Sequence, residues 1–259
     1  MPAHLQSTSH GQTLVLTLSN PERHNALDPS LYAAGVEALN GAERNAEVRS
    51  VVIAGAGGTF SAGGDLQRLQ ASREHGAQAQ AQSIEALHTW IETIRAYPKP
   101  VIAAVEGAAA GAGFSLALAC DLIVAARNAV FTMAYANVAL SPDGGGSWSL
   151  ARLLPRQLAA ELLLCGERIG ADRLHALGVV NRLADAGQAL SVALALAQDL
   201  NDKAPNAMAS IKQLLGDAAD ASLATHLAAE RDQFVKNLFH ANAGEGIAAF
   251  LDKRPPRYL

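Results

Sequence analysis

Residues 101–126 read VIAAVEGAAAGAGFSLALACDLIVAA, and this stretch decides which class of fold the chain can adopt. Its length and low polarity would suit a membrane span, but two acidic residues interrupt it, and charged groups are costly inside a bilayer. Val101–Val105 is a continuous apolar run, typical of a strand that is buried on both faces. Gly111–Ala119 predicts a buried helix, and Leu122–Ala125 predicts another strand. The stretch therefore predicts a parallel strand–helix–strand unit.

The flanking residues extend this pattern into an α/β half followed by a helical half. Further strands are expected at Thr13–Leu18, Val51–Ala54 and Val130–Met133, with helices at Pro29–Arg44 and around Ile84–Ile94. The helices expected in the second half are Ser147–Leu154, Leu158–Cys165, Ala171–Ala176, Gln188–Leu200, Asn206–Asp217, Ser222–Phe239 and Glu245–Leu251. We therefore predict an α/β fold. The polar, Gln/Ala-rich residues 67–82 are typical of a mobile flap.

The composition is that of a folded protein without the features of a secreted or nucleic-acid-binding one. Half of the 259 residues are hydrophobic and 17% are charged, which excludes a disordered chain. The net charge is -4 without a long basic run, so neither nucleic acid nor a membrane is an expected partner. Residues 1–11 lack the apolar core of a signal peptide. Cys120 and Cys165 both lie in apolar runs and are expected to be buried and reduced, in a cytoplasmic protein.

Familiar cofactor and catalytic motifs are absent or incomplete. Gly55–Phe60 follows a strand like a dinucleotide-binding loop, but its sixth position is Phe instead of Gly. The sequence contains no Gly-Lys-Ser/Thr phosphate loop, no His-Glu-x-x-His zinc motif and no Gly-x-Ser-x-Gly nucleophile turn. We therefore expect no metal and no permanently bound cofactor.

Two Gly/Ala-rich loops that follow buried strands are the strongest candidates for a functional site. The first is Phe60-Ser-Ala-Gly-Gly-Asp-Leu66, and the second is Gly107-Ala-Ala-Ala-Gly-Ala-Gly113. Small residues let a ligand approach the main chain, and a helix that begins after the second loop directs free N–H groups at an anion. Two such groups that converge on one oxygen form an oxyanion hole. The same composition is typical of tight helix–strand packing, so both interpretations stay open at this point.

Several motifs in a fixed order resemble those of the enoyl-CoA hydratase/isomerase (crotonase) superfamily. Phe60–Leu66 and Lys99–Gly113 are similar to its two oxyanion loops. Pro21-Glu-Arg-His-Asn-Ala-Leu27 resembles its CoA-wrapping loop, Leu140–Trp148 its active-site turn, and Gly178-Val-Val-Asn181 a further signature. The resemblance extends from about Gly11 to Arg257, and the active-site turn is similar to that of the phenylacetate-pathway isomerases.

This resemblance implies a β/α spiral core, which we place at residues 1–195, and a helical C-terminal oligomerisation region at 196–259. It also implies a homotrimer or homohexamer and an acyl-CoA substrate. Coenzyme A is then present as part of the substrate. The superfamily fold hosts many reactions, so the chemistry has to be argued from individual residues.

By position, the resemblance assigns the two oxyanion N–H groups to Ala62 and Ala112, which would stabilise the enolate of a thioester. The residues expected to line the acyl-CoA site around them are Gly63, Gly64, Asp65, Leu66, Gly111, Ser115 and Tyr135. The residues expected at CoA itself are Arg23, Asn25, Ala26 and Lys253. Asn25 is expected to fix the CoA loop through side-chain hydrogen bonds, and Lys253 to reach the CoA of a neighbouring subunit.

The expected catalytic groups differ from those of a hydratase. Hydratases of the family carry two glutamates, at the positions of Ser115 and Tyr135 here, because one activates water and the other handles the α-proton. Asp143 remains at the active-site turn, where the phenylacetate-pathway isomerases also carry Asp. One base suffices for an isomerase, since it removes a proton and returns it to another carbon through the enolate. We therefore expect an enoyl-CoA isomerase with Asp143 as its base.

Three other interpretations stay open. One is a hydratase with displaced catalytic groups. Another is a CoA-ester hydrolase or dehalogenase, because His88 and Asp143 are similar in position to the catalytic pair of the 4-chlorobenzoyl-CoA dehalogenases. A lone His on an apolar helix face is, however, also typical of a packed core residue. The last is a CoA-binding protein that turns over no acyl-CoA.

Overall fold

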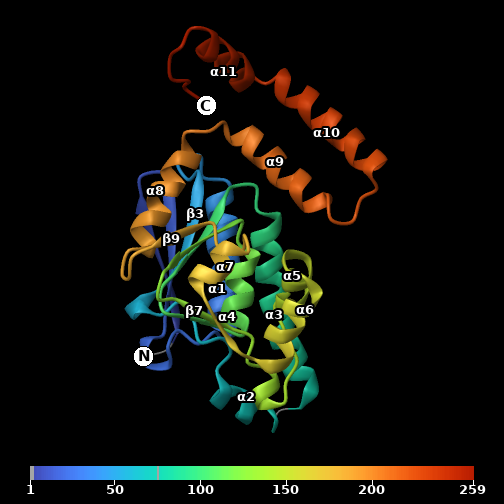
Figure 1. Cartoon of the computed structure of the whole chain (residues 1–259). Helices are drawn as coiled ribbons and strands as arrows, with labels where there is room; N and C mark the ends of the chain where they lie inside the picture. The colour runs from blue at the N-terminus through green and yellow to red at the C-terminus, as the bar shows by residue number, and fades with distance from the viewer. Residues whose placement is uncertain (1–2, 75) are drawn as a thin grey trace.

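The computed structural model describes residues 3–74 and 76–259, and a six-stranded sheet lies at its centre (Figure 1). In spatial order the strands are β1 (His4–His10), β2 (Thr13–Ser19), β3 (Ser50–Gly55), β4 (Val101–Val105), β6 (Leu122–Ala126) and β9 (Arg182–Ala184). β1 is antiparallel to β2, and all other neighbours are parallel. The expected parallel units are therefore confirmed.

Helices cover both faces of this sheet and divide the core into two parts. The helices of the body are α1 (Pro29–Glu43), α2 (Leu66–Ser72), α3 (Ala77–Ala96), α4 (Ala112–Ala119), α5 (Gly146–Leu153), α6 (Arg156–Ala160), α7 (Ala171–Ala176) and α8 (Ala189–Asn201). On one face, Leu31 of α1, Trp90 of α3 and Phe114 of α4 are fully buried in the larger core. On the other face, α8 packs through Ala193 and Ala197. Because β4 is covered from both sides, its residues are continuously apolar.

Glu106 joins the end of β4 to the start of α8. Its carboxylate accepts the N–H groups of Gly187 at 3.1 Å and of Ala189 at 2.8 Å. A carboxylate at this position satisfies free N–H groups of the helix and interacts favourably with the helix dipole. One of the two charges that interrupt the apolar stretch thus holds α8 against the sheet.

A smaller sheet carries the second Gly/Ala-rich loop. Its strands are β5 (Ala108–Ala110), β7 (Val130–Thr132) and β8 (Arg168–Gly170). β5 pairs in parallel with β7, and β7 pairs antiparallel with β8. Because β5 ends directly before α4, the second sheet fixes where α4 begins.

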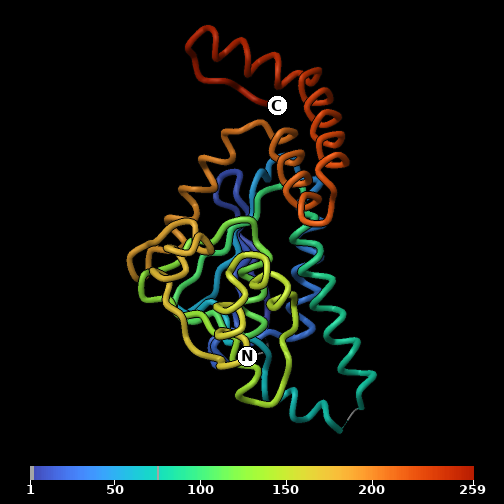
Figure 2. The backbone as a smooth tube through the Cα atoms, turned by 45° about the vertical axis from the view of Figure 1, so that its right-hand side comes forward, coloured from blue at the N-terminus to red at the C-terminus, as the bar shows by residue number. Residues whose placement is uncertain are grey.

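The C-terminal helices are α9 (Pro205–Asp217), α10 (Leu223–Leu238) and α11 (Ala241–Leu251). α9 lies against the body, whereas α10 and α11 extend away from it (Figures 1 and 2). Lys212 of α9 holds the contact, because its Nζ donates to the Asp121 carboxylate at 2.7 Å and to the Ile94 carbonyl at 3.0 Å. The helical second half is confirmed. The division at residues 195/196 falls within α8 and stays a prediction.

Parts of the chain differ from the sequence-based expectation. β1 was not expected, because its side chains are mostly exposed and polar. Its backbone pairs with β2, and Leu5 packs against the core. The expected flap at residues 67–82 consists largely of α2 and the start of α3, and its residue 75 lies outside the described residues.

The segment expected to be one helix, Leu158–Cys165, ends in a π-turn, Glu161–Cys165. Cys165 there is exposed, so its expected burial is wrong, while Cys120 is buried.

Within residues 3–74 and 76–259, no helix is both long enough and apolar enough to cross a membrane.

Candidate active site

The first Gly-rich loop lies alongside β5, which leads into the second. The Ser61 N–H donates to the Ala108 carbonyl at 3.0 Å, and the Ala110 N–H donates back to the Ser61 carbonyl at 2.9 Å. Phe60 is anchored in the same way to the Glu106 carbonyl at 2.8 Å. The two segments, far apart in the sequence, therefore run side by side in parallel at this point, through the bridge between Ser61 and Ala109.

The glycines in these loops are required for close contact between them. A Cβ at Gly63 would lie 2.5 Å from the Ala110 oxygen and 3.2 Å from the Ala112 nitrogen, and the φ of Gly63 is +86°. A Cβ at Gly113 would lie 2.7 Å from Cβ of Ser61. The first loop is thus in van der Waals contact with the N-terminus of α4.

The two expected oxyanion donors are in different states. Ala112 is the first residue of α4, and its N–H has no hydrogen-bond partner among the described residues. The Ala62 N–H, in contrast, donates to the His24 carbonyl at 2.9 Å. A free N–H at a helix N-terminus attracts an anionic oxygen. A ligand oxygen can therefore accept the Ala112 N–H directly. To accept the Ala62 N–H, it has to share this donor with the His24 carbonyl or replace the carbonyl.

Asp143, Tyr135, Ser115 and Gly111 are brought together beside the start of α4. The Tyr135 hydroxyl donates to Oδ1 of Asp143 at 2.6 Å. The Ser115 hydroxyl donates to the backbone oxygen of Asp143 at 2.9 Å. A Cβ on Gly111 would lie 3.5 Å from the Tyr135 hydroxyl, so this hydroxyl is next to the second loop. The structure thus brings Asp143, Tyr135 and Ser115 into direct contact beside the second loop.

Two tyrosines near Asp143 remain protonated at neutral pH. Burial raises the pKa of Tyr135 well above its usual value, and the Asp143 carboxylate raises it further. Burial also raises the pKa of Tyr32, on α1, to about 12. Neither phenol is therefore a base at neutral pH, and the Tyr135 hydroxyl is the one that donates to Asp143.

His88 is placed less favourably for catalysis. Its side chain is 41% exposed, and its Nδ1 lies 3.9 Å from the Glu85 carboxylate on the same helix. No hydrogen bond or ion pair joins His88 to Asp143 among the described residues. The Asp–His pair suggested by the sequence is therefore not formed in this structure.

Asn25 is the centre of the loop that precedes α1. Its side chain is fully buried and donates to the carbonyls of Ala56 at 2.8 Å and Thr59 at 2.7 Å. Its Oδ1 accepts the Asn20 N–H at 2.9 Å, and its backbone oxygen accepts the Ser61 hydroxyl at 2.8 Å. The expected side-chain hydrogen bonds of Asn25 to the backbone are present, and a contact of this loop with CoA stays a prediction.

Arg23 and Asp65 connect the same loop to α2. The Arg23 guanidinium hydrogen-bonds to the Asp65 carboxylate, which also caps α2 by accepting the N–H groups of Gln67 and Arg68. Burial raises the pKa of Asp65, but the hydrogen bonds from Arg68 and Arg23 outweigh it and hold the pKa below its usual value. Arg23 thus already has an anionic partner.

The other expected residues are spread over the molecule. Ala26 is buried, Gly64 pairs with Leu27 in a bridge between the loops, and Leu66 is 57% exposed at the start of α2. Lys253 follows α11, which stands away from α4 (Figure 1). Lys253 is therefore not part of the cluster around Asp143 in this chain. The role of His24, whose carbonyl holds Ala62, was missed because no sequence motif reports a backbone acceptor.

Comparison with known proteins identifies the family of the chain. The family model for "Enoyl-CoA hydratase/isomerase" matches residues 9–259. The chain is 36% identical over 246 residues to 1,2-epoxyphenylacetyl-CoA isomerase of Escherichia coli (strain K12), covering 95% of this chain and 94% of that protein. It is 34% identical over 247 residues to 2,3-dehydroadipyl-CoA hydratase of the same organism, covering 95% of each.

A solved structure gives the same result for the fold. The crystal structure of an enoyl-CoA hydratase from Polaromonas sp. JS666 is 68% identical and covers 98% of this chain and 99% of that one, with a TM-score of 0.98. The expected crotonase fold is thereby confirmed. Because the family match spans nearly the whole chain and both glycine-rich loops meet at α4, the protein belongs to the enoyl-CoA hydratase/isomerase family of acyl-CoA enzymes.

Proposed function

We propose that this enzyme isomerises an enoyl-CoA and that Asp143 is the single base that moves a proton along the acyl chain. The main support is the set of contacts around Asp143. Tyr135 donates to its carboxylate at 2.6 Å and Ser115 to its carbonyl at 2.9 Å. By the resemblance drawn from the sequence, these side chains correspond to the two glutamates of the hydratases. Because a neutral phenol and a neutral alcohol are not bases at neutral pH, neither group can replace a glutamate in activating water.

In this proposal the thioester oxygen binds at the N–H of Ala112, with the N–H of Ala62 as second donor. An oxyanion-hole donor is worth about 3–4 kcal/mol in the transition state. The Ala62 N–H would exchange the His24 carbonyl for the thioester oxygen as negative charge develops there. The CoA moiety would lie along the loop fixed by Asn25. Arg23 would meet a CoA phosphate if it turned away from Asp65. Coenzyme A enters only as part of the substrate.

The names of the relatives favour two reactions. The E. coli relative named 1,2-epoxyphenylacetyl-CoA isomerase supports isomerisation, of a double bond or of an epoxide. The relative named 2,3-dehydroadipyl-CoA hydratase supports hydration as the second candidate. A hydrolase that uses His88 has less support, because no hydrogen bond or ion pair joins His88 to Asp143 among the described residues.

We further propose that the protein forms a homotrimer or a pair of trimers through its helical C-terminal region, residues 196–259. Large apolar side chains on α10 and after it are exposed, including Phe234 at 68%, Phe239 at 84% and Phe250 at 84%. Exposed apolar surface of this kind is typical of protein–protein contacts. In such an assembly Lys253 would lie near the CoA of a neighbouring subunit.

A panel of acyl-CoA substrates in deuterated water tests the reaction. The substrates are a 3-enoyl-CoA, a 2-enoyl-CoA, 4-chlorobenzoyl-CoA and an aromatic epoxide-CoA, and the products are followed by mass spectrometry. Movement of the double bond with deuterium uptake and no addition of water, or ring expansion of the epoxide, supports isomerisation. Addition of water to the 2-enoyl-CoA as the main reaction, or loss of chloride or of CoA, contradicts it.

The variant Asp143→Asn tests the base directly. Loss of a general base typically costs about 10²–10⁴-fold in rate, so isomerisation should fall by that factor. Binding of a non-reactive acyl-CoA, measured by calorimetry, should stay close to wild type because the oxyanion loops are intact. Asp185→Asn, at an exposed position, is the matched control and should leave turnover unchanged. Wild-type turnover in Asp143→Asn would remove Asp143 from the mechanism.

A further inference from the structure

The two carboxylate oxygens of Asp143 have different environments. Oδ1 accepts the Tyr135 hydroxyl at 2.6 Å. Oδ2 has no hydrogen bond to any residue in the described part of the chain. A distance of 2.6 Å is at the short end for an O–H donor, as is usual when the acceptor is charged. The carboxylate is thus held through one oxygen and open at the other.

Tyr135 is held in place by its neighbours and keeps its proton for donation. It stands directly before the 3₁₀ turn Ala136–Val138, and its ring carbon Cζ lies 3.4 Å from the Cβ position of Gly111. Burial, followed by the negative charge of Asp143, raises its pKa far above neutrality. A Cβ at residue 111 would be in van der Waals contact with this ring. The second oxyanion loop and the carboxylate are therefore linked through one phenol.

We infer, on the basis of the proposed function, that Tyr135 is the positioning residue of the base: its hydroxyl fixes Oδ1 and leaves Oδ2 as the atom that takes and returns the proton. In the first step an O–H bond forms at Oδ2 while a C–H bond of the acyl chain breaks, and the electron pair passes into the thioester enolate. In the second step the O–H bond breaks and a C–H bond forms at another carbon. Protons and electrons balance without a co-reactant.

Holding the carboxylate through one oxygen has a stereochemical consequence. A carboxylate that cannot rotate presents Oδ2 to one face of the acyl chain, so the same proton can be removed and returned on that face. If the hydrogen that is removed carries an isotopic label, part of this label is then returned to the same molecule instead of being exchanged with solvent. Without Tyr135, rotation of the carboxyl group would expose the proton to exchange.

Few charged or titratable groups act on this pair. Tyr32 of α1 is close enough for its pKa to be raised by Asp143, and Arg68 of α2 and Asp28 act on Tyr32 in turn. Ser115 of α4 contacts the backbone of Asp143, and α3 approaches the same turn through Leu87 beside Gly144. Tyr135 is the side chain among these that hydrogen-bonds to the carboxylate.

The test is the variant Tyr135→Phe, assayed for kcat, KM and label transfer as a function of pH. Loss of a donor to a charged group shifts a titration by about one unit, a tenfold change in proton affinity, so the acid limb of the kcat profile should move up by about one pH unit. We expect kcat at neutral pH to fall about tenfold, KM to stay within twofold, roughly the error of such a comparison, and solvent deuterium in the product to rise.

Tyr32→Phe is the matched control. Tyr32 is also buried and near Asp143, but makes no hydrogen bond to it among the described residues, so this variant should keep the wild-type acid limb. If Tyr135→Phe does not fold, 3-fluorotyrosine at position 135 keeps the shape and strengthens the donor. It should move the acid limb down instead of up.

An unchanged acid limb and unchanged label transfer in Tyr135→Phe, or in the fluorinated protein, overturn the inference. The proposed function is judged separately by Asp143→Asn. If Asp143→Asn is inactive while Tyr135→Phe has a wild-type profile, only the role of Tyr135 fails. If Asp143→Asn keeps full activity, the proposed function fails with it.

Discussion

At the residue scale, Asn25 shows how one buried amide can fix a functional loop. Its φ is +55°, a left-handed conformation that Asn adopts more readily than most residues. Both of its donors and its acceptor are used within the protein. The resemblance of residues 21–27 to a CoA loop pointed to Asn25, but its partners could not be predicted, since Ala56 and Thr59 are 31 and 34 residues away and offer only backbone oxygens.

Asn25→Ala should lower the free energy of unfolding by about 2–4 kcal/mol, because it leaves buried backbone groups without partners and puts Ala at a positive φ. Chemical denaturation with fluorescence detection measures this loss. Asn40→Ala, on the exposed face of α1, should change stability by no more than about 0.5 kcal/mol. Equal stability of the two variants would show that the hydrogen bonds of Asn25 contribute little.

At the scale of elements, buried strands can be predicted from the sequence far better than exposed or short strands. β3 and β4 were predicted correctly because burial on both faces demands continuous apolar runs. β1 has exposed polar side chains, and β5, β8 and β9 have three residues each, so no periodicity could report them. Asp143 could be placed at a turn, but its hydrogen bond to Tyr135, eight residues earlier, depends on how the 3₁₀ turn folds back.

Gly63→Ala should disturb the contact between the first loop and α4. The new Cβ would lie 2.5 Å from the Ala110 oxygen, so the loops must separate and Ala112 must shift from Ala62. A displacement of this size in a catalytic site costs on the order of 10²-fold in kcat/KM.

Gly58→Ala separates steric effects from backbone strain. Gly58 also has a positive φ, +75°, but a Cβ there would meet nothing within 4 Å. This control should lose about 1 kcal/mol of stability and keep its activity. Similar activity of the two variants would mean that the close contact at Gly63 is not needed for catalysis.

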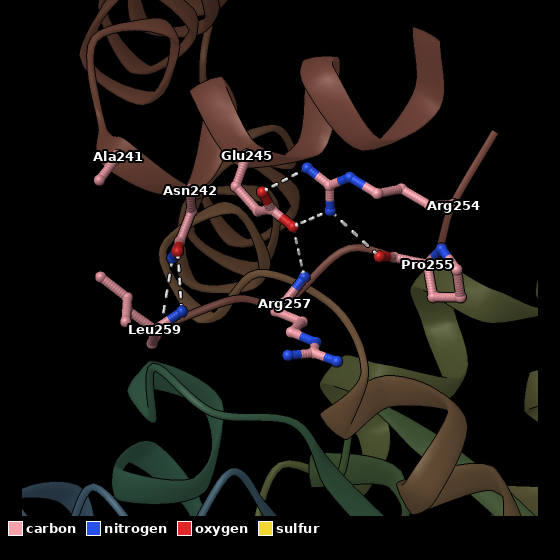
Figure 3. A pocket seen from close by; sticks show the side chains of 7 residues that line it. All are labelled: Ala241, Asn242, Glu245, Arg254, Pro255, Arg257 and Leu259. Carbon is pink, nitrogen blue, oxygen red and sulfur yellow. Dashed lines mark hydrogen bonds and ion pairs between the residues drawn. The ribbon is translucent and has the colours of Figure 1, made fainter. Parts of the chain in front are cut away.

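At the scale of the whole molecule, the C-terminal tail ties α11 to the body. Glu245 accepts two hydrogen bonds from the Arg254 guanidinium, at 2.7 and 2.9 Å, and one from the Arg257 N–H at 2.8 Å (Figure 3). Asn242 pairs with the backbone of Leu259, and Arg49 of the body donates to the Tyr258 carbonyl at 3.0 Å. The orientation of α11 thus depends on the last residues of the chain.

This tail should be released by acid. The hydrogen bonds from Arg254, followed by that from Arg257, lower the pKa of Glu245 to about 2. Because the folded-state pKa is lowered, the stabilisation is present above the usual value of about 4.3 and is lost as the pH falls from there towards about 2. Glu245→Gln should mimic this loss at neutral pH.

Digestion by a carboxypeptidase measures the release, because a free C-terminus is cleaved faster than a bound one. Glu245→Gln should lose Leu259 and Tyr258 several-fold faster than wild type. Glu92→Gln, on the exposed face of α3, should not. Equal rates in all three proteins would indicate that Arg49 and Asn242 hold the tail without Glu245.

The carboxylate of Glu106 also sets an order of events during synthesis. It lies between β4 and the second glycine-rich loop, yet its partners are the N–H groups of residues 81 and 83 positions later. A nascent chain that has left the ribosome only as far as α7 has neither of these groups to offer. The strand that carries the loop is then complete, while the acidic side chain beside it is still unpaired. The pairing of Glu106 therefore has to wait for α8, long after the residues of the second glycine-rich loop have emerged.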